Sequence, residues 1–455
     1  MKDIIPNSLQ FAKKKPLSST ISSGWKKWLN AVVEYWKSHH INAWAIFYFI
    51  VYIILVLKFV TIRELDDGIL FGAYSILVSL YILSRFALAY LYDPVPTGNS
   101  EGYEPTVTFA VPSKNEGANI RETIMKIAES DYPKHKFDIV AVNDGSTDAT
   151  LAEMLEAKKL AKRIGVEVEV VHWEENRGKR EGMAECTLRS KNELVVFIDS
   201  DSFVVEDTLR ELVKYFIDPR VGAVAGHGFV ANADTNALTK MQDVRYFVAF
   251  KAYKAAESLF GTVTCCSGCG SAYRRTYMMK VLDEWRYQKF LGQQCTYGDD
   301  RSLTNFLLRD GYITLYAPKA KIYTIVPDTF RQFMRQQLRW KKSWTKETLK
   351  AGLFIWKRNP IMSISFYLGA ILPLVSPIVA LRALIWQPFL TGNAPWFYII
   401  GLFLMALCYG IYYYVYTRDK YWIYGVCFAI IYTLALMWQL PWAMMTLKDP
   451  RWGTR

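Results

Sequence analysis

The sequence lacks both a disulfide framework and a complete zinc site. It contains seven cysteines, an odd number, and five of them precede residue 300. This usage is typical of a reducing compartment. Cys265, Cys266 and Cys269 lie close together, but no second cysteine pair and no nearby histidine completes a tetrahedral zinc set. We therefore expect neither structural zinc nor paired cysteines.

No nucleic-acid-reading module and no cleavable signal peptide can be recognised in the sequence. The formal net charge is nevertheless +13. A basic chain can bind nucleic acid, or it can lie at an anionic membrane face and handle phosphorylated substrates. Because no reading module is present, we expect membrane lipids and phosphorylated substrates as partners, and no nucleic acid.

Long apolar runs are the most prominent feature that is present. Hydrophobic residues make up 52% of the chain, and the first two runs cover 42–60 and 69–92. Each has the roughly 20 residues that a membrane crossing requires. The lysine-rich N-terminus should stay in the cytosol, so the chain from residue 93 onward is cytosolic again. Ahead of the first run, 24–38 has the pattern of a basic amphipathic helix on the membrane surface, or of a plain solvated helix.

Three further apolar runs follow residue 350, at 361–386, 396–416 and 421–446. Three complete crossings would place the basic C-terminal end outside, whereas the positive-inside rule places it inside. We therefore predict that 396–416 is the last complete crossing. The run 421–446 should be broken at Pro441 into a re-entrant or interfacial element.

Between the two groups of apolar runs, short apolar segments alternate with polar helical stretches. This alternation predicts an α/β domain with a mainly parallel sheet that is covered on both faces. Ligands of such sheets bind beyond the carboxyl ends of the strands. The predicted strands are 107–112, 137–142, 166–172, 193–198 and 221–227.

Carboxylates directly follow two of these strands. Asp144 comes after the second strand, where its oxygens suit a uracil N–H or a ribose hydroxyl, although an ordinary turn is the plainer interpretation. Asp199 and Asp201 close the fourth strand. Two carboxylates two residues apart suit one Mg²⁺ or Mn²⁺ ion that shares a diphosphate ligand, with a surface acidic turn as the alternative.

Two other segments carry candidate chemistry. Lys179, in the basic segment 176–180, suits a diphosphate or a sugar, or simply begins a solvated helix. Asp300 is our candidate for a general base, with Asp299 as the second choice. A sugar hydroxyl is a poor nucleophile at neutral pH, and a carboxylate within hydrogen-bond reach can take its proton.

Residues 329–350 have the pattern of an amphipathic, interfacial helix. Gln336 can hydrogen-bond a ligand, Arg339 can neutralise a leaving diphosphate, and Trp340 can stack on a sugar face. A helix that merely snorkels its Arg and Trp at a membrane surface would look the same. Trp452 and Arg455, in the basic tail, can close over a nucleotide or belong to a frayed terminus.

Four motifs occur in an order and spacing that resembles the processive membrane glycosyltransferases of family 2, which include cellulose, chitin and hyaluronan synthases. They are Asp144, Asp199-Ser200-Asp201, Gly298-Asp299-Asp300 and Gln336-x-x-Arg339-Trp340. The resemblance extends from about residue 105 to the C-terminus. It implies a GT-A type nucleotide-sugar-binding domain between N- and C-terminal transmembrane helices. It also implies an inverting transfer from UDP-sugars without a covalent intermediate, and export of the nascent polysaccharide through the membrane helices.

The resemblance also implies roles for individual residues. Asp300 would be the base, and Asp199 with Asp201 would hold Mg²⁺ or Mn²⁺. The donor and its UDP would contact Pro112, Glu116, Asp144, Lys179, Asp199, Arg339, Trp452 and Arg455. The acceptor would contact Cys266, Ser267, Gly268, Gln336 and Trp340, with Trp340 as its platform.

Within the family, three segments look like hyaluronan synthases in particular: 290–305, 336–344 and 452–455. The loop 267–275 departs from them and is closer to the nodulation chitin-oligosaccharide synthases, as is 326–328. We therefore favour hyaluronan made from UDP-glucuronate (UDP-GlcA) and UDP-N-acetylglucosamine (UDP-GlcNAc). A chitin-type synthase that uses UDP-GlcNAc alone, a transferase of one sugar to a polyprenyl phosphate, and a non-enzymatic nucleotide-sugar transporter or scaffold remain alternatives.

We expect an integral protein of the plasma membrane in which a single chain suffices to enclose the channel. Its sequence divides into six parts. The parts are a cytosolic N-terminus (1–40), a transmembrane hairpin (41–92), a cytosolic catalytic domain (93–328), an interfacial helix (329–350), a C-terminal membrane region (351–447) and a gating tail (448–455).

Overall fold

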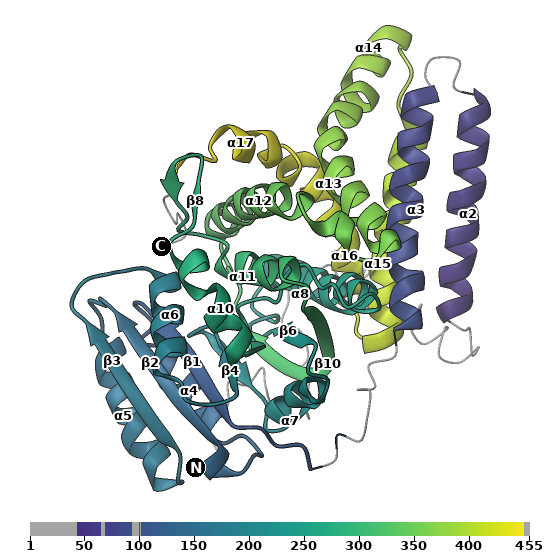
Figure 1. Cartoon of the computed structure of the whole chain (residues 1–455). Coiled ribbons are helices and arrows are strands. Elements are labelled where there is room, and N and C mark those ends of the chain that lie inside the picture. The colour runs from purple at the N-terminus through teal and green to yellow at the C-terminus, as the bar shows by residue number, and fades with distance from the viewer. Residues whose placement is uncertain (1–42, 65–68, 93–99, 101, 450–455) are drawn as a thin grey trace.

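The computed structural model describes residues 43–64, 69–92, 100 and 102–449. Figure 1 shows an α/β domain at the bottom of the view and a group of long helices above and to its right. The predicted surface helix at 24–38 lies outside the described residues, as do Trp452 and Arg455.

An eight-stranded sheet forms the centre of the domain, in the order β3-β2-β1-β4-β7-β6-β10-β5. Neighbouring strands are parallel, except that β7 runs antiparallel to β4 and β6, and β5 runs antiparallel to β10. The predicted α/β fold with a mainly parallel sheet is therefore confirmed. The strands are β1 (Val107–Ser113), β2 (Phe137–Asp144), β3 (Glu167–Trp173), β4 (Leu194–Phe197), β5 (Ser202–Val204), β6 (Val221–Val230), β7 (Ser271–Arg274) and β10 (Ile313–Thr324).

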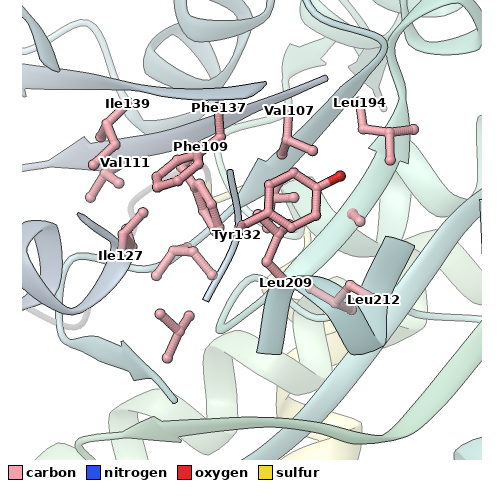
Figure 2. Close-up of a cluster of buried hydrophobic side chains, with 14 of the residues drawn as sticks. Val107, Phe109, Val111, Ile127, Tyr132, Phe137, Ile139, Leu194, Leu209 and Leu212 are labelled. Atoms are coloured by element: carbon pink, nitrogen blue, oxygen red, sulfur yellow. The ribbon is translucent and has the colours of Figure 1, made fainter. Parts of the chain in front are cut away.

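Helices cover both faces of the sheet because its strands are apolar on both sides. Along β1, Phe109 and Val111 belong to one buried cluster, shown in Figure 2, whereas Ala110 belongs to a second cluster on the opposite face. The first cluster is completed by α4 (Ile120–Ala128), α5 (Thr150–Arg163) and α7 (Thr208–Val213). The second is completed by α6 (Lys179–Arg189), α10 (Arg275–Arg286) and α11 (Asp299–Arg309).

The long helices come from both ends of the described chain. They are α2 (Ala43–Glu64), α3 (Ile69–Leu91), α13 (Pro360–Leu381) with its continuation α14 (Gln387–Thr391), α15 (Trp396–Thr417), α16 (Trp422–Ile431) and α17 (Gln439–Met445). Among the described residues, three segments are long and apolar enough to cross a membrane: Leu70–Leu91, Pro360–Thr391 and Tyr398–Thr417. A bent pair, Trp422–Leu436 with Gln439–Met445, would make a fourth. In α2 the apolar stretch is shorter, at Ala45–Lys58.

The bend in the last pair is not at the predicted position. The two segments meet at an angle of 43°, and the break falls at 437–438, before Gln439 rather than at Pro441. Pro441 instead lies in the first turn of α17, where a backbone N–H would have no intrahelical partner and a proline ring is tolerated. The prediction of a broken element is confirmed, and its break point was wrong.

The domain and the long helices share a hydrophobic core. Helix α8 (Ala237–Val248) packs against α15 and α16, and its Phe247 lies in one buried cluster with Phe47 of α2 and Tyr412 of α15. Polar contacts reinforce this junction, since the Tyr413 hydroxyl donates to Asp243 Oδ2 at 2.7 Å. The domain is therefore held directly against the helices that follow residue 360.

Helix α12 (Phe330–Gly352) differs from the expected apolar and polar faces. The aromatic residue Phe330 is 52% exposed, whereas the charged residues Lys346 and Glu347 are almost fully buried. Lys346 Nζ donates to the Tyr297 carbonyl at 2.8 Å, and Asn305 Nδ2 donates to Glu347 Oε2 at 3.1 Å. The C-terminal half of α12 therefore packs against the segment that carries Asp299 and Asp300.

Candidate active site

A single large cavity, about 2290 Å³ in volume, begins beyond the carboxyl ends of β1, β2 and β4 and extends between the long helices. Most of the residues singled out in the sequence line it. They are Pro112, Glu116, Asp144, Lys179, Asp199, Asp201, Ser267, Gly268, Asp299, Asp300, Gln336, Arg339 and Trp340. Residues that are up to about 230 positions apart in the sequence thus face one space.

Asp144 holds the loop that precedes α6. Its Oδ1 accepts from Arg177 N at 2.5 Å and its Oδ2 accepts from Gly178 N at 2.9 Å. Burial raises the pKa of Asp144 and these two N–H groups act in the opposite direction. Gly145 permits this close approach: its φ is +61°, and a Cβ there would lie 2.5 Å from Asn176 N. Each carboxylate oxygen keeps a second lone pair for a ligand.

Lys179 and Asp199 form an ion pair in the centre of the cavity. Burial alone would lower the pKa of Lys179, but Asp199 outweighs it and the pKa is raised. Asp201, two residues on, has a pKa raised to about 7 by burial and by the neighbouring Asp199 carboxylate. Two carboxylates therefore lie close enough to repel each other, with one ammonium group as partial compensation.

This pair fits a divalent cation. A hard cation takes oxygen ligands and is often held by only one or two carboxylates together with substrate phosphates. No group of three or more His, Cys, Asp or Glu side chains in the described part of the chain is arranged to hold a metal. Asp199 and Asp201 would therefore supply the protein ligands, and a diphosphate would supply the others.

Asp299 and Asp300 begin α11 but have different surroundings. Asp299 is buried, and its Oδ1 lies 2.7 Å from Arg180 Nη2. Asp300 faces the cavity, and its Oδ2 accepts from Gly268 N at 3.2 Å. Gly298 precedes them with φ +78°, a left-handed conformation that glycine adopts without strain. Of the two carboxylates, only Asp300 is placed to reach a molecule in the cavity without losing a buried partner.

Three residues of α12 complete the cavity wall. Gln336 Oε1 is buried and has no hydrogen-bond partner among the described residues. Burial lowers the pKa of Arg339, while Asp199 and Asp300 act to raise it, so its guanidinium lies near both carboxylates. The Trp340 ring packs at 6.2 Å from the ring of Tyr246, measured between centroids.

Three comparisons bear on this arrangement. Residues 105–343 match the model of the family described as glycosyltransferase like family 2. A hyaluronan synthase of Streptococcus pyogenes is 30% identical over 392 residues, which cover 84% of this chain and 90% of that protein. An N-acetylglucosaminyltransferase of Rhizobium meliloti is 32% identical over 344 residues, 75% of this chain and 78% of that protein.

The chain belongs to glycosyltransferase family 2. The fold agrees with this assignment. A mannosyltransferase of Pyrobaculum calidifontis, solved in complex with GDP-Man and Mn²⁺, superposes with a TM-score of 0.60 at 21% identity. The superposition covers 84% of this glycosyltransferase and all of that chain. The predicted GT-A type domain with flanking apolar helices is thus confirmed for the described part of the chain.

Among the described residues of the glycosyltransferase, one predicted site residue lies outside the cavity. Cys266 is fully buried, and its backbone N–H donates to Thr304 Oγ1 at 3.0 Å. Its side chain belongs to the core between the sheet and α11. Its neighbour Cys265 lines the cavity instead, with Sγ 3.6 Å from Asp300 Oδ2.

Three residues that the sequence did not indicate as site residues contribute to the cavity or to its support. Arg180 pairs with Asp299. Arg245, on α8, lies over the ring of Trp340 at 5.6 Å. Lys341, beside Trp340, donates from Nζ to Gln439 Oε1 at 3.2 Å. Arg245 stands in no recognisable motif, and Lys341 directly follows the motif that ends at Trp340. The packing of α8, α12 and α17 brings the two together.

Proposed function

We propose that this glycosyltransferase is a processive, inverting polymerase of UDP-sugars that also exports its product. The observation that carries the proposal is the continuity of the cavity. One space joins the carboxylates at Asp199 and Asp300 to Trp340 and then to helices α3, α13, α15 and α16. A growing chain can therefore move from the site of transfer toward the membrane without leaving the protein.

In the transfer itself, Asp300 takes the proton of the acceptor hydroxyl as that oxygen attacks the anomeric carbon. The bond from the anomeric carbon to UDP breaks on the opposite side, so the configuration inverts. Lys179 and Arg339 lie near the carboxylate cluster and neutralise the departing diphosphate. Trp340 offers an apolar face to the last sugar of the acceptor, and Gln336 offers a free acceptor oxygen.

A divalent cation at Asp199 and Asp201 would supply charge stabilisation for the diphosphate. The Mn²⁺ in the mannosyltransferase of similar fold supports this expectation. Asp144, Pro112 and Glu116 line the part of the cavity next to this pair, so we assign the nucleotide to that part.

For the membrane arrangement, we propose a cytosolic catalytic domain and a single chain in the plasma membrane. The described spans Leu70–Leu91, Pro360–Thr391 and Tyr398–Thr417 would surround the exit of the cavity, with the bent pair 422–445 as a partial or fourth crossing. We further propose that α12 lies at the membrane surface and that the tail after residue 449 closes over the nucleotide.

The polymer that best fits is hyaluronan, made from UDP-GlcA and UDP-GlcNAc, as the similarity to the streptococcal hyaluronan synthase over 84% of the chain supports. The experiment supplies purified protein with each UDP-sugar singly and with both, plus Mg²⁺ or Mn²⁺. Polymer should form only when both sugars are present. Polymer from UDP-GlcNAc alone would contradict the hyaluronan proposal.

A chitin-type product is the second candidate, because the similarity to the rhizobial N-acetylglucosaminyltransferase is as high, at 32% identity. The same experiment separates the two, since a chitin-type synthase needs UDP-GlcNAc alone. A lipid-extractable single-sugar product would contradict both candidates, and with them processivity.

A further inference from the structure

The charges on the cavity wall are unevenly distributed between its two ends. Around the sheet, basic and acidic side chains are mixed. In the part lined by α2, α3 and α13 to α17, the wall carries two charged side chains, Lys58 and Arg382, and no described carboxylate. Charged groups inside a membrane segment are costly, face cavities and mark the paths of ions and substrates.

The two membrane cations have neutral partners. Lys58 Nζ donates to the Ser75 hydroxyl, and a Cβ added to Gly401 would lie 3.3 Å from that ammonium, so it sits between α3 and α15. The Arg382 guanidinium lies over the Phe71 ring, 4.1 Å from its centroid. Because Phe71 and Ser75 occupy neighbouring turns at the start of α3, both cations lie toward the end of α3 that Figure 1 shows farthest from the sheet.

Two more cations lie where the cavity leaves the catalytic domain. Arg245 is held between the Trp340 ring, at 5.6 Å, and the Phe428 ring of α16, at 5.2 Å. Lys341 contacts Gln439 and has no carboxylate within salt-bridge distance among the described residues. Burial, with Arg245 nearby, lowers the pKa of Lys341 to about 7, which is the expected consequence of placing it among neutral and basic groups.

We propose that Arg245, Lys341, Lys58 and Arg382 form a cationic track that holds an anionic polysaccharide as it moves from Trp340 to the far end of the cavity. The proposal rests on the proposed polymerase function and specifies its product as a chain with repeated carboxylates. A neutral polymer would leave four half-buried cations without compensation along its whole route. Carboxylates that pass from one cation to the next would offset part of their burial cost and would slow release of the chain.

The test uses the full chain in vesicles of neutral phosphatidylcholine, supplied with both UDP-sugars. A double variant, Lys58→Gln with Arg382→Gln, removes the two membrane cations without touching the residues that we assign to transfer. We expect its product to be shorter by about threefold to fivefold, which corresponds to about 0.7–1 kcal/mol at 1.4 kcal/mol per tenfold change. The initial rate of UDP release should stay within about twofold of wild type.

Two comparisons isolate the charge. The pair Lys58→Arg with Arg382→Lys keeps both charges and should keep the wild-type length. Lys319→Gln removes an exposed lysine outside the cavity and should also have no effect.

Hyaluronan of unchanged length from the glutamine pair would overturn the track while leaving the proposed function intact. So would equal shortening by the charge-conserving pair, or a shortening that occurs only in vesicles of anionic lipid, since these cations would then act on headgroups. A chitinase-sensitive product of the wild type would instead refute the proposed function.

Discussion

Arg180 Nη2 lies 2.7 Å from Asp299 Oδ1, and both side chains are almost fully buried, at 6% and 4% exposed. Arg180 Nη1 also donates to the Cys295 carbonyl at 2.6 Å, so the guanidinium ties the start of α11 to the loop before it. Asp300, the next residue, faces the cavity. Of two adjacent carboxylates, one therefore fixes the helix start and the other faces the cavity.

This relationship predicts opposite consequences for two matched substitutions. Asp299→Asn leaves the Arg180 charge buried without its partner, which should lower the free energy of unfolding by about 3–5 kcal/mol. Asp300→Asn should leave unfolding unchanged but reduce UDP release by about 100-fold or more, because the acceptor hydroxyl loses its base. Thermal unfolding in detergent and UDP release measure the two effects. Full polymerisation by Asp300→Asn would show that the base is another group.

The contact between Gly298 and Ser343 predicts a second effect on the same helix start. A Cβ at Gly298 would overlap the Ser343 hydroxyl of α12, and φ there is +78°. Gly298→Ala should therefore push α12 away from α11 and lower the free energy of unfolding by roughly 1–3 kcal/mol. Gly311→Ala is a matched control, since φ is also positive there, at +90°, but a Cβ would meet no atom within 4 Å. Comparable losses of activity in the two variants would contradict the role of the contact.

Lys341 predicts a pH dependence of stability. Burial lowers its pKa to about 7 in the folded protein, from the ordinary lysine value of 10.5 in the unfolded chain. Between these two values the unfolded chain binds more protons, so the free energy of unfolding rises with pH, by up to about 1.4 kcal/mol per pH unit. Lys341→Met should remove this rise. Unfolding temperatures at neutral and at mildly alkaline pH measure it, with Lys319→Met as an exposed control; equal slopes for wild type and Lys341→Met would rule the effect out.

The position of Trp340 predicts that binding of the acceptor can be separated from activation of the donor. Trp340→Ala removes an aromatic face of about 150–250 Å². We expect UDP release to continue through hydrolysis of the donor while the product becomes short, and Trp340→Phe should restore part of the length. Gel analysis of product size checks this. A Trp340→Ala product of wild-type length would mean that the acceptor rests elsewhere.

Removal of divalent cations should abolish UDP release, because the negative charge of Asp199 and Asp201, which Lys179 compensates only in part, would then repel the diphosphate. Mg²⁺ or Mn²⁺ added back should restore it. Asp201→Asn should raise the metal concentration needed for half-maximal activity. Activity that is unaffected by chelation would contradict the proposal that the two aspartates hold a divalent cation.

The sheet and the main residues of the cavity could be predicted from the sequence where a local pattern carries them. The apolar strands that end at Asp144 and Asp199 are such patterns, because a strand buried on both faces is apolar throughout and its polar residues follow its end. In contrast, β7 has only four residues, and β10 contains Pro318 and changes register with β6 between Tyr316 and Lys321. Neither strand had a regular alternation to reveal it.

The part of the site that could not be predicted depends on contacts between distant segments. Cys266 and Cys265 are identical neighbours, and only their packing decides which one lines the cavity. The role of Asp299 depends on Arg180, which lies 119 residues earlier. Arg245 likewise belongs to a helix whose sequence gives no sign of a site. Its position matters because α12 and α16 place aromatic rings on both sides of it.

The proposed function requires above all that one cavity serves both transfer and export. Proteoliposomes that carry the catalytic domain on the outside test it directly when they are given both UDP-sugars and a divalent cation, followed by hyaluronidase. We predict that the polymer accumulates in the lumen, survives the enzyme and is degraded only after detergent is added. Polymer that is fully degraded without detergent would contradict it.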